Sequence, residues 1–228
     1  MANRNTAGFG LIAAGTLGAT PSTGGQNKYK IDSGYPTSLY LGMPVQIDSA
    51  SGANVDAGYL ISAQDAITVP TIGVFNGAFY TDANTLKPTF ASFYPGGTVP
   101  TANANNGDID AFIIDNPFQL FVGSAAAAVT QANMGRTVSF AAAVPTGREQ
   151  SGQCTNSMDI TGITDTTKQW RIIRSAEDPE NQLLREVEGY LIIPTSIVSN
   201  MTEFTKVPEL LSTHRTDVAQ SIEKLLYR

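Results

Sequence analysis

The stretch GDIDAFIIDNPFQLFVG, residues 107–123, contains two apolar runs separated by a turn signal. Three apolar side chains of the first run share one parity: Ile109, Ala111 and Ile113. This alternation is typical of a β-strand with one buried face. Asp-Asn-Pro at 115–117 predicts a turn, because Asp and Asn bond their own backbone and Pro cannot extend a ladder. The apolar alternation then resumes at residues 118–122, so we expect two consecutive strands joined by a tight turn.

The same stretch holds three aspartates, Asp108, Asp110 and Asp115. They are candidates for paired catalytic acids, for metal ligands, or for the polar ends of strands. A calcium loop needs further oxygen ligands and a closing Glu, and none follows at that spacing. A glycoside hydrolase needs two carboxylates about 5 to 10 Å apart across a cleft, which the sequence alone does not place. We interpret the aspartates as structural, with Asp115 starting the turn.

Composition bears on the partners of the chain. The 228 residues carry a net charge of -6, and the pI is about 4.7. Binding to nucleic acid or to an anionic membrane needs clustered Lys and Arg, so we expect neither partner. Residues 9–19 are apolar but are interrupted by glycines, and no run approaches the roughly eighteen apolar residues of a membrane span. We therefore expect a soluble protein.

Reactive side chains are scarce. Cys154 is the single cysteine and His214 the single histidine. One cysteine excludes an intrachain disulfide, and one cysteine with one histidine excludes the usual zinc sites. The chain has no G-x-S-x-G elbow and no phosphate-binding glycine loop. We predict that the protein is not an enzyme and has no catalytic, metal-binding or cofactor-binding residue.

Charge placement predicts the fold class. No glutamate precedes Glu149, and glutamate favours helices over strands. Beyond the opening stretch, strand patterns occupy residues 38–48, 66–82, 89–99, 136–144, 169–178 and 183–194. We expect a mainly β fold, a single β-barrel or sandwich-like domain at residues 31–200. An extended N-terminal arm at residues 1–30 precedes this domain, and a linker with an amphipathic α-helix at residues 201–228 follows it.

Apolar side chains near the two ends are candidates for contacts with a partner or within an oligomer. The arm carries Phe9, Leu11 and Ile12. These side chains either anchor the arm to a partner or form a strand folded onto their own domain. The terminal helix carries Val218, Ile222 and Leu225 at helical spacing.

An aromatic cluster lies beside the Pro-Gly-Gly break at residues 95–97. We expect Phe90 and Phe93 to pack in the core. Tyr94, next to the break, is the better candidate for a surface contact.

Several stretches, taken in order, resemble the small β-rich virion proteins of tailed bacteriophages known as head decoration or cement proteins. The resembling stretches lie within residues 1–195: MANRNTAGFGLIAAGTLG, KYKIDSGYPTSLYLGMPVQID, TIGVFNGAFYTD, TFASFYPGGTV, GDIDAFIIDNPFQLF and RIIRSAEDPEN. The segment from Pro208 onward falls outside the resemblance.

The resemblance implies a structural protein on the exterior of an icosahedral capsid. Such a protein would bind the major capsid protein and clamp neighbouring subunits as a symmetric homo-oligomer, with a trimer preferred over a dimer. Three alternatives remain open. They are a carbohydrate-binding or adhesin module that uses exposed aromatics, a glycoside hydrolase that uses two of the three aspartates, and a tail or baseplate component.

Overall fold

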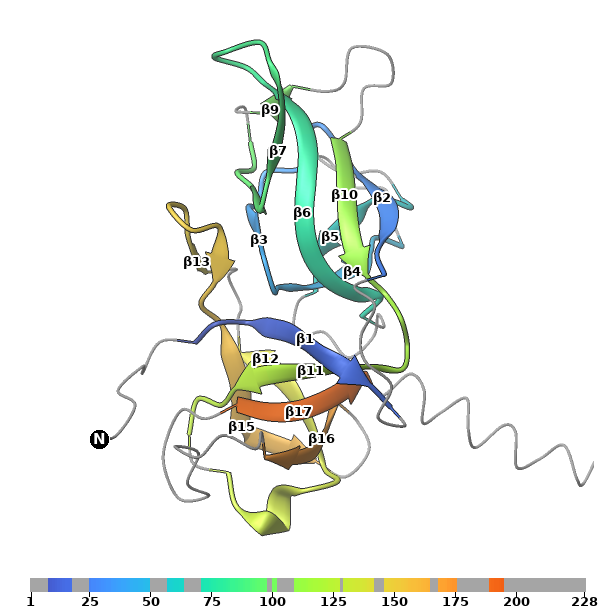
Figure 1. The fold of residues 1–228 in the computed structure, drawn as a ribbon, viewed down its shortest axis with the longest axis vertical. Coiled ribbons are helices and arrows are strands. Elements are labelled where there is room, and N and C mark those ends of the chain that lie inside the picture. Colours follow the sequence, from blue (N-terminus) through green and yellow to red (C-terminus); the bar gives the residue numbers. More distant parts are fainter. Residues whose placement is uncertain are drawn as a thin grey trace, which may run out of the picture. The chain divides into compact units, whose positions relative to one another are not determined.

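The structure is a computed structural model that describes residues 8–17, 25–49, 57–63, 71–97, 100–101, 109–127, 129–141, 146–164, 168–175 and 189–194. These residues are mainly β, as predicted, and they form several sheets (Figure 1). The helical element among them is a single 3-10 turn, η1 (Gln131–Asn133). Contacts divide the chain after Pro194 into two units. The predicted helix at residues 201–228 belongs to the second unit and lies outside the described residues.

A seven-stranded antiparallel sheet contains the first of the two predicted strands. Its order is β2-β10-β6-β4-β5, and β7 and β9 also pair with β6. The strands are β2 (Asn27–Ile31), β4 (Pro44–Ile47), β5 (Leu60–Ser62), β6 (Gly73–Asp82), β7 (Pro88–Ala91), β9 (Pro100–Thr101) and β10 (Ile109–Ile114).

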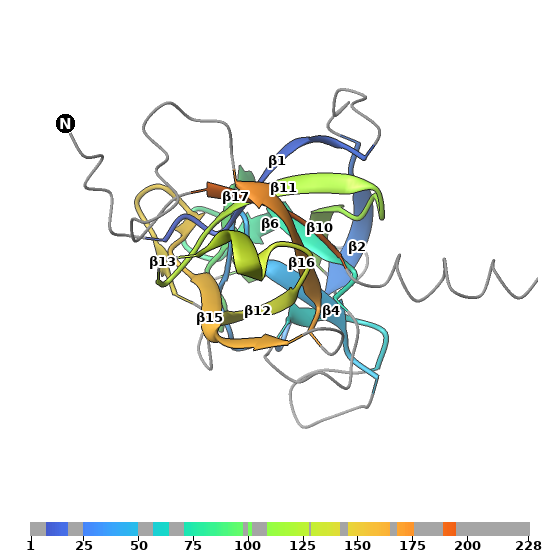
Figure 2. The same ribbon diagram turned by 90° about the horizontal axis from the view of Figure 1, so that it is seen from below.

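A six-stranded sheet contains the second predicted strand, in the order β1-β11-β17-β16-β12-β15. The strands are β1 (Leu11–Thr16), β11 (Gln119–Ser124), β12 (Thr137–Ala141), β15 (Ser157–Thr164), β16 (Trp170–Ser175) and β17 (Gly189–Pro194). Strands β1 and β11 lie side by side (Figures 1 and 2). Two short pairs complete the described fold: β3 (Leu39–Tyr40) with β8 (Phe93–Tyr94), and β13 (Gly147–Arg148) with β14 (Gln153–Cys154).

The turn between β10 and β11 confirms the prediction made from the opening stretch. The N–H of Phe118 donates to the Asn116 side-chain oxygen at 3.0 Å, and the N–H of Gln119 donates to the Asn116 carbonyl at 3.0 Å. The two strands do not pair with each other. Instead, the turn carries the chain from the seven-stranded sheet into the six-stranded sheet.

The predicted N-terminal arm differs from the structure. Within residues 1–30, β1 pairs with β11 and the start of β2 pairs with β10. The N–H of Leu17 also donates to the Phe118 carbonyl at 2.8 Å. Residues 11–16 and 27–30 therefore belong to strands of the two sheets, and β2 starts before the predicted boundary at residue 31. The alternation of Lys28, Tyr29, Lys30 and Ile31 is the strand signal that the arm interpretation passed over.

The buried side chains form two hydrophobic clusters. The first cluster fills the inner side of the seven-stranded sheet, where the rings of Tyr35 and Tyr94 stack with centroids 6.2 Å apart. The second cluster lies against the six-stranded sheet and centres on the fully buried Trp170. The edge contacts of Trp170 with Phe121 and Phe140 have centroid distances of 5.7 and 6.3 Å. Aromatic edge contacts of this kind add to the stabilisation from burial.

The short segment Leu41 to Met43 bonds to three parts of the fold, and we call it the junction. The N–H of Gly42 donates to the Phe75 carbonyl of β6 at 2.9 Å, and the Gly42 carbonyl accepts the N–H of Leu11 of β1 at 2.8 Å. Leu41 exchanges backbone hydrogen bonds with the segment that contains β14. Gly42 has a φ of 85°, which L side chains rarely adopt. The junction thus links β1 and β6 through the backbone of one residue.

Candidate interaction surface

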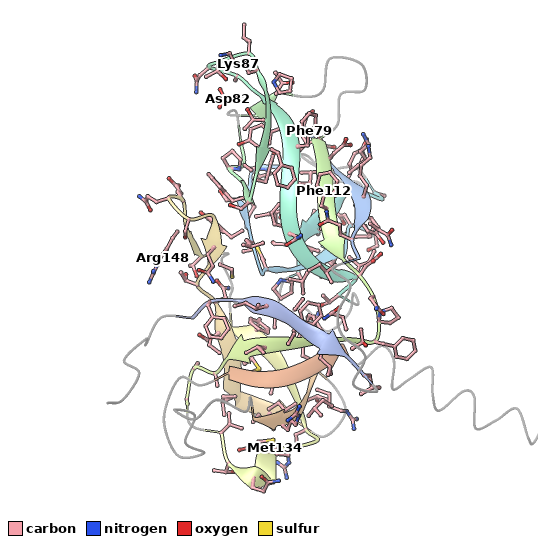
Figure 3. The ribbon with its side chains drawn as sticks, in the orientation of Figure 1. Phe79, Asp82, Lys87, Phe112, Met134 and Arg148 are labelled. Carbon is pink, nitrogen blue, oxygen red and sulfur yellow. The ribbon has the colours of Figure 1, made fainter. Side chains whose placement is uncertain are left out.

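The outer side of the seven-stranded sheet carries three phenylalanines. Across β6 and β7, Phe79 lies opposite Phe90, and across β10 and β6, Phe112 lies opposite Gly77. Directly opposite residues of antiparallel strands point to the same side. Ala78, which alternates with these β6 residues, is buried in the first cluster. Phe79, Phe90 and Phe112 therefore share the outer side, and we call them the outer aromatic face (Figure 3 labels Phe79 and Phe112).

Phe90 is the most exposed member of this face, with 60% of its surface accessible. Its ring centroid lies 5.6 Å from that of Phe112, with the planes tilted by 56°. The ring also covers Gly77, because a Cβ built on Gly77 would lie only 2.8 Å from Cζ of Phe90. An aromatic ring that covers a glycine of a sheet in this way protects the exposed backbone. The packing places Phe90 on the sheet while leaving its outer surface open.

A charged group borders the face on β2 and β10. Lys30 lies opposite Asp110, and Lys28 lies opposite Phe112. The ammonium nitrogens of Lys28 and Lys30 lie 3.0 and 2.8 Å from the two oxygens of Asp110. The Asp110 side chain is 11% exposed, whereas Lys28 is 56% exposed. Two cations share one anion, so this border carries a net charge of about +1 at neutral pH.

The environment of Asp110 has two opposing effects on its pKa. Burial raises the pKa of Asp110. The hydrogen bonds and charges of Lys30 and Lys28 lower it by more than burial raises it, so the pKa lies below the ordinary 3.8. The carboxylate is therefore ionised at neutral pH and engaged by its two lysines.

The turn from β6 to β7 stands at one end of the same sheet. The Asp82 carboxylate accepts the N–H groups of Asn84 and Thr85 at 2.8 and 2.9 Å. These bonds, with that of Thr85 first, lower the pKa of Asp82. Leu86 follows with a φ of 56° and is 75% exposed, next to Lys87 (Figure 3 labels Asp82 and Lys87). The carboxylate thus closes the turn in the manner of an Asx turn.

Asp115, which follows the last residue of β10, joins β10 to the neighbouring strand β2. Its two oxygens accept the amide of Asn27 at 3.0 and 2.9 Å, and the Tyr29 hydroxyl donates to Oδ2 at 2.7 Å. Burial, and then the bond to Asp115, raise the pKa of Tyr29 to about 12. Asp110 and Asp115 therefore both bind side chains of β2. Asp108 lies outside the described residues.

Two of the three aromatic predictions are wrong. Tyr94 was expected at the surface, but it is fully buried and its hydroxyl donates to the Tyr35 carbonyl at 2.8 Å. Phe90 was expected in the core, but it is exposed. Phe93 is half-buried and packs against the first cluster, as expected. The reason is that β7 ends at Ala91 and β8 starts a new pairing with β3, which changes the side to which each aromatic points.

The three N-terminal candidates lie on or beside β1. Leu11 is buried at 3% exposure, Phe9 is half-buried, and Ile12 is 49% exposed. Because β1 pairs with β11, the alternative of a strand folded onto its own domain is confirmed. Burial removes Leu11 from the candidates for a partner contact, since its side chain already packs in the second cluster.

A cavity of about 240 Å³ lies beside the N-terminal strand. Its lining includes Phe9, Ile12, Arg148, Gln153 and Cys154. Burial raises the pKa of the Cys154 thiol to about 11, against a smaller lowering by the N–H of Asn156. The thiol is therefore protonated at neutral pH and is a weak nucleophile.

The remaining candidates of the terminal helix, Val218, Ile222 and Leu225, lie outside the described residues, as does His214. Within the described ranges, no group of three His, Cys, Asp or Glu side chains is placed to hold a metal ion. Among the residues that the structure describes, no helix has the length and apolar character needed to span a membrane.

The outer aromatic face was missed by sequence reasoning, because its members come from three strands and Lys28 and Lys30 from a fourth. The signals were present: Phe112 alternates with the buried Ala111, and the two lysines alternate with Tyr29. Aromatic side chains are enriched on the surfaces by which proteins bind other macromolecules. No protein-family model matches the chain, and neither the curated proteins nor the solved structures give a match.

Proposed function

We propose that this chain is a structural virion protein that binds the outside of an icosahedral phage capsid and clamps neighbouring major capsid subunits. The proposal joins the sequence resemblance to decoration proteins with one structural observation. That observation is the outer aromatic face, where Phe90 is 60% exposed on a strand paired within the seven-stranded sheet.

The physical requirements of a decoration protein agree with this observation. Clamping a shell needs no reaction, only a rigid scaffold and side chains that a partner can cover. Phe90 is placed by Gly77 beneath it and Phe112 beside it, so little side-chain freedom is lost when a partner covers it. Repetition over many equivalent lattice sites makes modest contacts effective, and binding only the assembled shell stabilises that shell by mass action.

The proposal also covers the oligomer, part of whose expected contact lies outside the described residues. We expect a homo-oligomer, a trimer before a dimer, that sits on a local symmetry axis of the capsid exterior. Val218, Ile222 and Leu225 of the predicted terminal helix are the expected oligomer contact. Closure of the sheets into a barrel or sandwich remains part of the same expectation.

The competing functions differ in what they require of the surface. The carbohydrate-binding alternative relied on exposed aromatics, and the burial of Tyr94 removes one expected sugar contact. The glycoside hydrolase alternative relied on two of Asp108, Asp110 and Asp115, of which Asp108 lies outside the described residues. Asp110 is engaged by Lys28 and Lys30, and Asp115 by Asn27 and Tyr29. A tail or baseplate position remains a rival within the virion.

The copy number of this chain per major capsid subunit, measured by quantitative mass spectrometry of purified particles, tests the proposal. Many copies in a simple ratio to the shell protein would support decoration and narrow the choice of symmetry axis. A few copies per particle would move the chain to the tail or baseplate. Absence from particles would overturn the virion function.

A truncation tests the oligomer contact separately. Removing residues 208–228 should convert the oligomer into monomers in light scattering, while the far-ultraviolet circular dichroism retains its β signal. A truncated chain that stays a monodisperse oligomer would show that the terminal segment is not the contact.

A further inference from the structure

The outer aromatic face has the features of a binding hot spot. Its three phenylalanines come from β6, β7 and β10, which are hydrogen-bonded neighbours in one sheet. Large aromatic side chains that are held in place by their neighbours dominate the binding energy of many protein interfaces. Phe90 has this character, since its ring rests on Gly77 and contacts Phe112 while 60% of its surface is exposed.

The charge at the border of the face selects the chemistry of its partner. Lys28 and Lys30 share the single carboxylate of Asp110, and Lys28 is 56% exposed. Among the described residues of this border, two ammonium groups face one carboxylate beside Phe112, in a chain whose net charge is -6. An acidic side chain on the partner would balance that charge and also steer the approach of the partner.

Two other occupants fit this surface less well. In a symmetric dimer the same patch meets itself, so a second copy would bring two positively charged borders together. A neutral sugar needs polar groups around the aromatic rings, and the oxygens of Asp110 already contact two lysines. A protein segment with apolar side chains next to a carboxylate satisfies both the rings and the lysines.

We propose that the outer aromatic face docks an acidic and apolar segment of the major capsid protein. This inference rests on the proposed virion function and adds the surface and the chemistry of the contact. Phe90 and Phe112 are covered by apolar side chains of the segment, and Lys28 pairs with one of its carboxylates.

The test is the rebinding of purified full-length chain to shells assembled from the major capsid protein alone. Phe90→Ser should weaken binding by at least ~10-fold, because it removes the most exposed ring of the face. Lys28→Glu should weaken binding by a similar factor and reverse its dependence on salt, since the border changes from about +1 to about -1 and then repels the partner carboxylate. Phe118→Ser is the matched control, because Phe118 is also exposed, at 49%, but lies in the turn between β10 and β11.

Folding of each variant is checked by circular dichroism and by the fluorescence of Trp170, which lies in the second cluster and not in the face. Wild-type affinity in both Phe90→Ser and Lys28→Glu would overturn the docking surface and leave the virion function standing. Failure of the wild-type chain to bind the shells would overturn the proposed function and this inference with it.

Two further measurements identify a different occupant. Loss of self-association in Phe90→Ser, measured by light scattering with shell binding unchanged, would assign the face to a second copy. Wild-type binding on a glycan array that is lost in Phe90→Ser would assign it to a sugar. Either result would overturn the proposed partner.

Discussion

Asp110 shows how one residue determines the charge of the surface. Its carboxylate is nearly buried and holds Lys28 and Lys30 at 3.0 and 2.8 Å. Asp110→Asn keeps the size of the side chain but removes the anion that the two lysines share. We expect this change to lower the free energy of unfolding by about 1–2 kcal/mol at pH 7, measured by urea denaturation.

The pH dependence separates this electrostatic effect from a packing defect. The pKa of Asp110 in the folded protein lies below 3.8, so its contribution is present above that pH and is lost as the pH falls below it. The stability difference between wild type and Asp110→Asn should therefore be full at about pH 6 and shrink between about pH 4 and pH 2. A difference that stays constant over this range would assign the loss to packing.

Tyr94 is a core residue, and its substitutions should act on stability. Its hydroxyl donates to the Tyr35 carbonyl at 2.8 Å inside the first cluster. Tyr94→Phe should cost about 1 kcal/mol through the lost hydrogen bond, and Tyr94→Ala about 3–5 kcal/mol through the cavity. Phe90→Ala is the control, since Phe90 is exposed. Thermal denaturation that finds Phe90→Ala as costly as Tyr94→Ala would contradict this assignment.

The error over Tyr94 and Phe90 shows the limit of sequence reasoning for single residues. Alternation predicts which residues share a side only while one strand continues. Between Ala91 and Phe93 the chain leaves its pairing with β6 and pairs with β3, and nothing in the letters TFASFY marks that change. The Gly77 site that receives Phe90 lies on another strand, so it could not be predicted from the local pattern.

At the scale of elements, β2 is held to its neighbour by side chains at both ends. The Tyr29 hydroxyl donates to Asp115 at 2.7 Å, and burial followed by this bond raises the pKa of Tyr29 to about 12. The folded state therefore holds the phenolic proton more tightly than the unfolded chain, whose tyrosine pKa is about 10. The stability that this proton supports is present below about pH 10 and falls as the pH rises toward about 12.

Tyr29→Phe tests this attachment of β2. The variant should be less stable than wild type at pH 8, and the difference should shrink by about 1–2 kcal/mol between about pH 10 and pH 12, after allowance for solvent screening. Chemical denaturation at each pH measures the difference. Burial also raises the pKa of Tyr80, so Tyr80→Phe is a control for a tyrosine that does not bind β2 to β10 through Asp115. If the free energies of unfolding of wild type and Tyr29→Phe change in parallel with pH, this hydroxyl does not hold β2 to β10.

Element prediction succeeded where the local sequence pattern by itself marks a strand. The strands β10, β12 and β16 fall within predicted runs and β11 overlaps one, because apolar alternation and turn residues define them locally. Strand β15 was missed, since MDITGIT mixes polar and apolar residues and is ordered by its antiparallel pairing with β12. Strand β2 carries a local alternation that was passed over, and β1 was expected only as one of two alternatives.

At the scale of the whole described fold, backbone hydrogen bonds link the sheets against which the two hydrophobic clusters pack. The junction bonds β1 of the six-stranded sheet and β6 of the seven-stranded sheet through a single residue, Gly42. The connection from β10 to β11 also passes between the sheets. Such links make us expect cooperative unfolding of the two clusters in the wild-type chain. Trp170, the single tryptophan, reports on the second cluster, and the buried tyrosines report on the first.

Gly42→Ala should weaken that link. A Cβ at Gly42 would lie 2.9 Å from the Leu11 carbonyl oxygen, and the φ of 85° adds backbone strain. We expect a loss of about 2–4 kcal/mol, and we expect the Trp170 and tyrosine transitions to separate as β1 is displaced. Gly58→Ala is the matched control, because Gly58 has a φ of 94° but no atom within 4 Å of an added Cβ, so only the strain of about 1–2 kcal/mol applies. If Gly42→Ala costs no more than Gly58→Ala and its two transitions coincide, the junction does not couple the two clusters.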